Sequence, residues 1–164
     1  MTRSGYLIAI AGLALAACGQ PGGNAGDANN ESEVLSATES FRDFGDYTLH
    51  FNALTTDQLT ERVAGEYDIV RSRNRVLLNV SILENQEVGL PTAVPGEVRA
   101  SARNLTGQLR NLDVREIREE AAIYYIAETA IVNAESLIFT VEATPEGEAE
   151  SFSVSFQKRF FVDE

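Results

Sequence analysis

The chain has 164 residues, of which 44% are hydrophobic and 23% are charged, and its formal net charge at pH 7 is -12. This length is typical of a single domain, and the acidic balance argues against binding nucleic acid or anionic lipid headgroups, both of which need clustered Lys and Arg. The only cysteine is Cys18, so a disulfide within the chain and a cysteine-ligated metal site in the folded part are excluded.

The first segment has the pattern of a secretory signal. Arg3 precedes an uncharged apolar run over residues 6–17, which is shorter than the roughly 20 residues that a membrane-spanning helix needs. The run ends in Leu15-Ala16-Ala17-Cys18, which resembles the lipobox of bacterial lipoproteins. Residues 1–17 are therefore predicted to be a lipoprotein signal peptide, with lipid on the Cys18 sulfur. The alternative is ordinary cleavage after Ala16, with no role for Cys18.

The segment after Cys18 indicates where the protein is held. Two or more acyl chains anchor a protein stably, so a triacylated Cys18 needs no transmembrane segment. Gly19, rather than an aspartate, follows the cysteine, and by the same resemblance this favours the periplasmic face of the outer membrane. Residues 19–36 are rich in Gly, Asn and acids, which predicts a disordered linker.

From residue 37 to residue 164 the pattern predicts one β-sandwich domain. Apolar and polar residues alternate with the period of two that is typical of strands, and turn-forming residues separate the runs. The predicted strands cover residues 47–51, 76–83, 98–103, 112–115, 122–132, 137–143 and 152–162. Seven to eight such strands indicate an all-β, antiparallel, immunoglobulin-like sandwich.

One segment between these strands has helical spacing. In residues 56–67, Leu59 and Val63 are four positions apart. Thr56 is the expected N-cap and Gly65 the expected stop. We expect one short helix there.

Residues that could carry chemistry are few. His50 is the only histidine, and a lone histidine on a strand is more often a surface residue than a catalyst. The folded part has no second His or Cys for a zinc site and no calcium-loop spacing. No metal and no cofactor are therefore expected.

Two charged stretches are candidates for binding. Arg71, Arg73 and Arg75 lie within five residues at an expected hairpin turn, where guanidinium groups either bind an anion or neutralise nearby acids. Residues 113–119 alternate bases and acids, including Arg115 and Glu116. This alternation fits a cross-strand ion-pair ladder. The alternative is a polar patch for a partner, formed with His50 and Tyr47.

Five sequence blocks, in order and with matching spacing, resemble the uncharacterised exported bacterial family called domain of unknown function 4426. They are Phe44-Gly45-Asp46-Tyr47-Thr48-Leu49-His50-Phe51, Tyr67-Asp68-Ile69-Val70-Arg71-Ser72, Leu78-Asn79-Val80-Ser81, Asn104-Leu105-Thr106-Gly107-Gln108 and Arg115-Glu116-Ile117-Arg118-Glu119. The resemblance covers the whole folded domain and brings no assigned activity. It emphasises Asp46, Tyr47, His50, Arg71, Asn79, Arg115 and Glu116.

The leading hypothesis is a lipid-anchored periplasmic domain that binds an envelope protein or other envelope component through one sheet face, without catalysis. The candidate binding residues are Asp46, Tyr47, His50, Arg71, Arg73, Arg115 and Glu116. One alternative is an enzyme that uses His50 with an acid such as Asp46 or Glu116. Another is a purely structural envelope lipoprotein.

Overall fold

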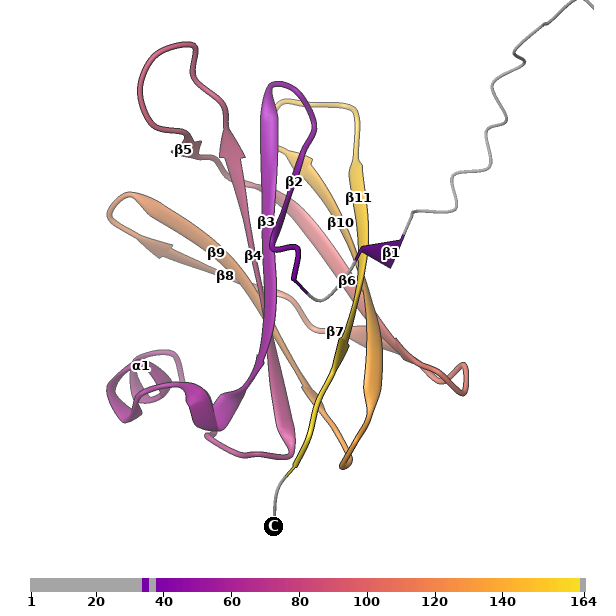
Figure 1. Ribbon diagram of the computed structural model, residues 1–164. Coiled ribbons are helices and arrows are strands. Elements are labelled where there is room, and N and C mark those ends of the chain that lie inside the picture. Colours follow the sequence, from indigo (N-terminus) through magenta and orange to yellow (C-terminus); the bar gives the residue numbers. More distant parts are fainter. Residues whose placement is uncertain (1–33, 36–37, 163–164) are drawn as a thin grey trace, which may run out of the picture. The chain divides into compact units, whose positions relative to one another are not determined.

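The protein, as a computed structural model, is described over residues 34–35 and 38–162, and these residues form two packed β-sheets (Figure 1). The first sheet has the order β1 (Val34–Leu35), β11 (Phe152–Arg159), β10 (Ser136–Pro145), β6 (Gly96–Asn104), β7 (Leu109–Leu112). We call it sheet A. The second sheet, sheet B, has the order β2 (Phe41–Asp43), β3 (Tyr47–Thr55), β4 (Arg75–Glu84), β9 (Ala122–Ala130), β8 (Arg115–Glu119), and β5 (Thr92–Ala93) pairs with the end of β4.

The prediction of an all-β antiparallel sandwich is confirmed. Every strand pair in the described residues is antiparallel except β1 with β11, which run parallel. Eight of the eleven described strands have four residues or more, and β1, β2 and β5 are shorter. The predicted count of seven to eight therefore matches the strands long enough to show alternation.

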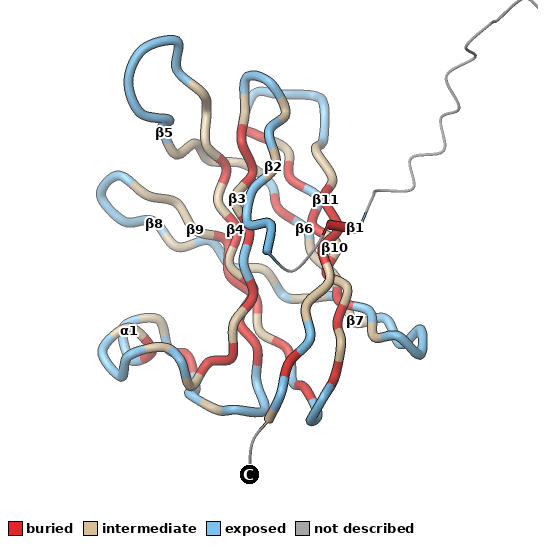
Figure 2. Tube along the Cα trace, in the orientation of Figure 1, coloured by how far each residue is buried: buried red, intermediate tan, exposed pale blue. Residues whose placement is uncertain are grey.

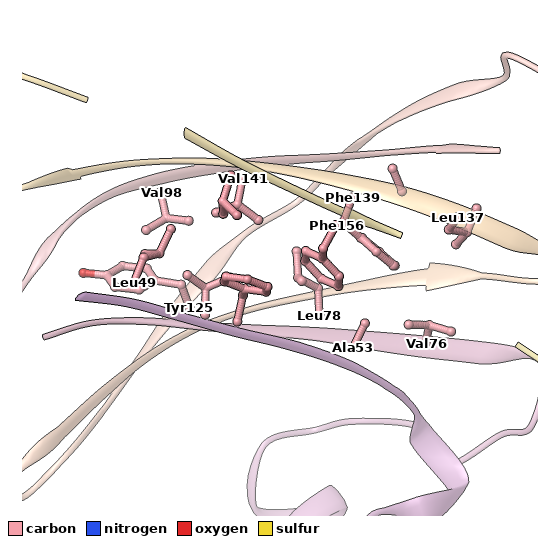
Figure 3. Packing of buried hydrophobic residues seen from close by; sticks show 14 of the residues in the cluster. Leu49, Ala53, Val76, Leu78, Val98, Tyr125, Leu137, Phe139, Val141 and Phe156 are labelled. Carbon is pink, nitrogen blue, oxygen red and sulfur yellow. The ribbon is translucent and has the colours of Figure 1, made fainter. Parts of the chain in front are cut away.

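The core lies between the two sheets because alternate residues of each strand point inward. Figure 3 shows Phe139 and Phe156 of sheet A facing Leu78 of sheet B. The ring of Phe156 stacks on Phe139 at 5.2 Å between centroids and on Phe51 at 4.8 Å. Buried residues follow the facing strands, and exposed residues gather at the loops (Figure 2). Aromatic rings from both sheets thus join the two layers.

The predicted strand over residues 112–115 is wrong. β7 ends at Leu112 in sheet A, and β8 begins at Arg115 in sheet B, so the chain crosses between the sheets at this point. Leu112 and Val114 both pack against the core during the crossing. The alternation continues through the crossover, and for this reason it could not reveal the change of sheet.

The predicted helix begins and ends elsewhere. A 3-10 turn, η1 (Thr56–Gln58), precedes the helix α1 (Glu61–Glu66). Thr60, and not Thr56, caps α1 by accepting a hydrogen bond from the Val63 N–H at 3.3 Å. Thr56 is buried, and its hydroxyl accepts from the Ser72 N–H at 2.9 Å in the loop before β4. The hydroxyl expected to cap the helix is therefore engaged by a distant segment.

The end of α1 also differs from the expectation. Gly65 lies within α1 and does not stop it. The residue in the left-handed region after the helix is Asp68, with φ of 51°. Asp tolerates this conformation better than most residues with a side chain, so a glycine is not needed at this position.

The sandwich begins before the predicted boundary at residue 37. Val34 and Leu35 pair with Ser155 and Phe156 as β1, and Leu35 is only 7% exposed. Two residues of the predicted linker therefore belong to the sheet. The predicted signal peptide, Cys18 and the linker up to residue 33 lie outside the described residues. Among the residues that are described, no helix combines the length and hydrophobicity needed to cross a bilayer.

Candidate functional site

Asp46 and Tyr47 lie where the turn after β2 enters β3. The Tyr47 hydroxyl donates a hydrogen bond to Glu148 Oε1 at 3.0 Å. This bond to a carboxylate raises the pKa of Tyr47 above its ordinary value. The backbone carbonyl of Asp46 accepts from the Asn85 N–H at 2.7 Å. Both residues thus tie loops together at this end of the sandwich.

Arg71 and Arg73 lie in the loop between α1 and β4, so the predicted hairpin turn is wrong. Arg71 donates to the Asp57 carbonyl at 2.9 Å, and its other nitrogen lies 3.4 Å from Glu61 Oε1. Arg73 Nε lies 3.8 Å from Asp57 Oδ2. The two guanidinium groups therefore face acids and a carbonyl of their own chain, as the neutralising alternative expects.

Arg115 and Glu116 are neighbours on β8 and point to opposite faces of sheet B. Arg115 donates to the Tyr67 carbonyl on the outer face, the face turned away from sheet A. Glu116 faces Tyr125 in the register and accepts a hydrogen bond from Arg118, which lowers the pKa of Glu116. A polar patch that includes Arg115, Glu116 and His50 is not formed, because alternation along β8 separates the first two.

His50 lies on the outer face of sheet B beside a small hollow. Its ring stacks on Phe41 with 5.7 Å between centroids. The hollow has a volume of about 250 Å³. Its lining, which we call the polar hollow, consists of Ser40, His50, Phe51, Asn52, Asn79 and Ser81. Within the part of the chain that the structure describes, this lining contains neither Asp46 nor Glu116.

A larger groove, which the sequence analysis missed, adjoins the polar hollow at Asn79. Its volume is about 920 Å³. Its floor is the outer face of sheet B, which includes the hairpin of β8 and β9, and its wall is the segment that holds α1. The helix α1 and this hairpin extend to the same side in Figure 1. The apolar lining, which defines the apolar groove, is Leu54, Leu59, Val63, Tyr67, Ile69, Leu77, Ile117, Tyr124 and Ile126.

The apolar groove exists because Leu77 of β4, with Tyr124 and Ile126 of β9, places apolar side chains on the outer face of sheet B as well. Leu77 and Ile126 point outward and are buried under the α1 segment, where they pack with Ala64 and Ile69 as a second cluster outside the main core. The short α1 covers only part of this cluster. Tyr124 and other lining residues are left half-exposed. The sequence does carry this signal, since residues 76–78 are apolar at three consecutive positions, but the same pattern also fits a central strand that is covered on both faces.

The rim of the apolar groove is acidic. Glu66, Glu119 and Glu120 line it, all exposed, with Arg62 as its basic residue. Arg62 is paired with Glu66 at 3.1 Å on consecutive turns of α1. At the inner end of the groove, Asn79 Oδ1 is buried and has no hydrogen-bond partner. The groove therefore offers a broad apolar surface with polar groups at its ends.

The described residues contain no group of three or more His, Cys, Asp or Glu side chains that could hold a metal ion. The groove and the hollow on the outer face of sheet B thus present apolar and hydrogen-bonding side chains, with charged residues at the rim of the groove. Such a surface can bind a ligand by burial and hydrogen bonding.

Comparison with known proteins supports the resemblance found in the motifs. The family described as Domain of unknown function (DUF4426) matches residues 41–163. The crystal structure of a DUF4426 family protein from Pseudomonas aeruginosa PAO1 is similar with a TM-score of 0.65 and 35% sequence identity, over 76% of this chain and 95% of that chain. No curated protein matches the chain.

Proposed function

This chain belongs to the DUF4426 family, and from this premise we propose that it is a non-catalytic binding module of the bacterial cell envelope. Lipid on Cys18 holds the domain at the periplasmic face of the outer membrane. The apolar groove takes an apolar segment of a partner protein in the envelope. The observation that carries the proposal is the groove itself, with a volume of about 920 Å³ on a sheet face outside the core.

The groove supports binding because its apolar side chains are only partly covered by the rest of the domain. Monomeric soluble proteins rarely leave contiguous apolar surface open unless it meets a partner or ligand. Ile117 and Tyr124, paired across β8 and β9, present such surface toward α1 without being fully covered. Burial of this surface by a partner gains about 25 cal/mol for each Å² removed from water.

A charge placed in the groove tests this proposal. Ile117→Glu puts a carboxylate on the apolar floor, and we expect it to weaken binding of the neutral fluorescent probe N-phenyl-1-naphthylamine by at least about tenfold, because burying the charge costs more than the lost contact. The matched control is Ile138→Glu, since Ile138 is equally half-exposed but lies on the outer face of sheet A. Fluorescence titration measures both. Equal affinity of the two variants, or no binding by the unchanged protein, contradicts the proposal.

The anchoring part of the proposal rests on the lipobox and is tested separately. Cys18→Ser removes the thiol that accepts the lipid, so we expect the chain to leave the membrane fraction or to remain as an uncleaved precursor. Ser32→Ala in the same segment is the control and stays with the membrane. Fractionation after salt and carbonate washing measures the distribution. A Cys18→Ser chain that is shortened and still membrane-bound contradicts lipid anchoring.

A further inference from the structure

The polar hollow is built from the hydrogen-bonding side chains of Ser, Asn and His residues, together with Phe51. His50 faces Ser81 and Asn52 faces Asn79 across β3 and β4, so the four side chains form two adjacent rows on one sheet face, with directly opposite Cβ atoms about 5 Å apart. Ser40 closes the edge. In a chain of net charge -12, this lining has no carboxylate among the described residues. Such a surface suits a ligand that is recognised by hydrogen bonds rather than by charge.

An exposed aromatic ring lies next to His50, one of the residues that line the hollow. Phe41 pairs with His50 in the register and stacks on it with an interplanar angle of 26°. The Phe41 side chain is still 57% exposed, so much of its surface is in contact with solvent. Aromatic faces carry partial negative charge and attract the weakly positive C–H groups of a ligand.

The Asn79 side chain determines which hydrogen-bonding group a ligand of the polar hollow must have. Its Oδ1 is buried and unpartnered, and an amide oxygen only accepts hydrogen bonds. Because this oxygen has almost no solvent-accessible surface, the amide must turn toward the hollow to meet a ligand. The ligand must then donate to it, which an ionised carboxylate cannot do. Asn52 is held in place by Lys158, whose Nζ donates to Asn52 Oδ1 at 3.4 Å. The amide nitrogen of Asn52 remains as a donor to an acceptor on the ligand.

We infer that the polar hollow binds a sugar ring that carries an N-acetyl group. Sugar hydroxyls both donate and accept, as the Ser, His and Asn side chains require, and the C–H face of the ring packs on Phe41. The acetamido N–H donates to Asn79 Oδ1, and its methyl group lies toward Leu77 and Ile126, where the apolar groove begins. The volume of about 250 Å³ is below the usual range of about 300–1,000 Å³ for drug-sized ligands, which suits a single ring.

The test is a titration of the ¹⁵N-labelled full-length chain with N-acetylglucosamine, followed by ¹⁵N–¹H NMR. We expect saturable shifts of the amide signals of Phe41, His50, Asn79 and Ser81. Glucose, which lacks the acetamido group, shifts them less at equal concentration, and sodium acetate does not shift them. Absence of shifts at these residues overturns the inference, as does an equal response to acetate.

Variants separate this site from the apolar groove. Phe41→Ala weakens sugar binding by about 3- to 10-fold, the loss expected for one aromatic contact. Phe161→Ala removes an equally exposed ring elsewhere, since Phe161 is 61% exposed, and leaves binding unchanged. The Ile117→Glu chain also keeps sugar binding, because Ile117 lines the apolar groove and not the polar hollow. Equal affinity of the Phe41→Ala and Phe161→Ala chains overturns the inference.

Discussion

Replacing Phe139 by Ala is expected to lower the free energy of unfolding by about 3–5 kcal/mol, the usual cost of deleting a buried ring. Phe139 is fully buried on β10, with β6 and β11 on either side. Its ring stacks on Phe156 and meets Phe160 edge-on at 6.3 Å. Removing the ring loses these contacts and leaves a cavity that the two sheets cannot close.

Urea unfolding, followed by far-ultraviolet circular dichroism, measures this effect. The control is Phe161→Ala, which removes a ring that is 61% exposed and contacts Arg159. A surface change of this kind shifts stability by about 0.5 kcal/mol or less. Since a domain of this size is stable by about 5–15 kcal/mol, the Phe139→Ala chain should lose a large fraction of its stability and unfold at a clearly lower urea concentration. A loss below about 1 kcal/mol would mean that Phe139 is not central to the core.

Gly96→Ala is the second substitution with a large expected cost, about 1–3 kcal/mol. Gly96 begins β6, and a Cβ placed on it would lie 2.4 Å from the Thr144 carbonyl oxygen and 3.1 Å from Pro145 Cα. Both atoms belong to the backbone of β10, so relief requires the strands to separate. The Gly96 N–H also donates to the Tyr125 hydroxyl at 2.7 Å, and any movement strains this bond between the two sheets.

Gly65→Ala is the matched control for the same chemical change. An added Cβ at Gly65 has no atom within 4 Å, and the residue lies within α1. Ala is favoured over Gly inside a helix by up to about 1 kcal/mol, so this variant should be slightly more stable. The two chains should thus shift the urea midpoint in opposite directions. If the Gly96→Ala chain has the same urea midpoint as the unchanged protein or a higher one, β6 and β10 do not approach closely enough to exclude a Cβ at this position.

The strands could be predicted because their signal is local. Alternation along residues 47–51 or 152–162 follows from side chains pointing to opposite faces of a strand, whatever the neighbouring strand is. The same local rule failed at residues 112–115, where Leu112 belongs to one sheet and Arg115 to the other. A second local rule, the preference of Thr for the N-cap position, failed at Thr56, whose hydroxyl contacts Ser72 while Thr60 caps the helix.

The candidate residues were predicted as one group, but the structure distributes them. Tyr47 contacts Glu148, Arg71 contacts Asp57, and Glu116 faces away from Arg115. Their positions depend on pairings between distant segments, which spacing along the chain does not specify. Asn79, which the family motifs did emphasise, lies where the apolar groove meets the polar hollow.

The sequence by itself determined the class of fold and the family, because both depend on local patterns of residues along the chain. The secretory signal and lipid on Cys18 stay predictions from residues 1–18. Only the tertiary structure decided that Leu77 and Ile126 face outward under α1, and that Phe41, His50 and Asn79 share one face of sheet B. The physical reason is that a binding surface is made by segments far apart in the chain. The alternation of apolar and polar residues shows which side chains of a strand share a face. The packing of the two sheets determines which of the two faces lies in the core.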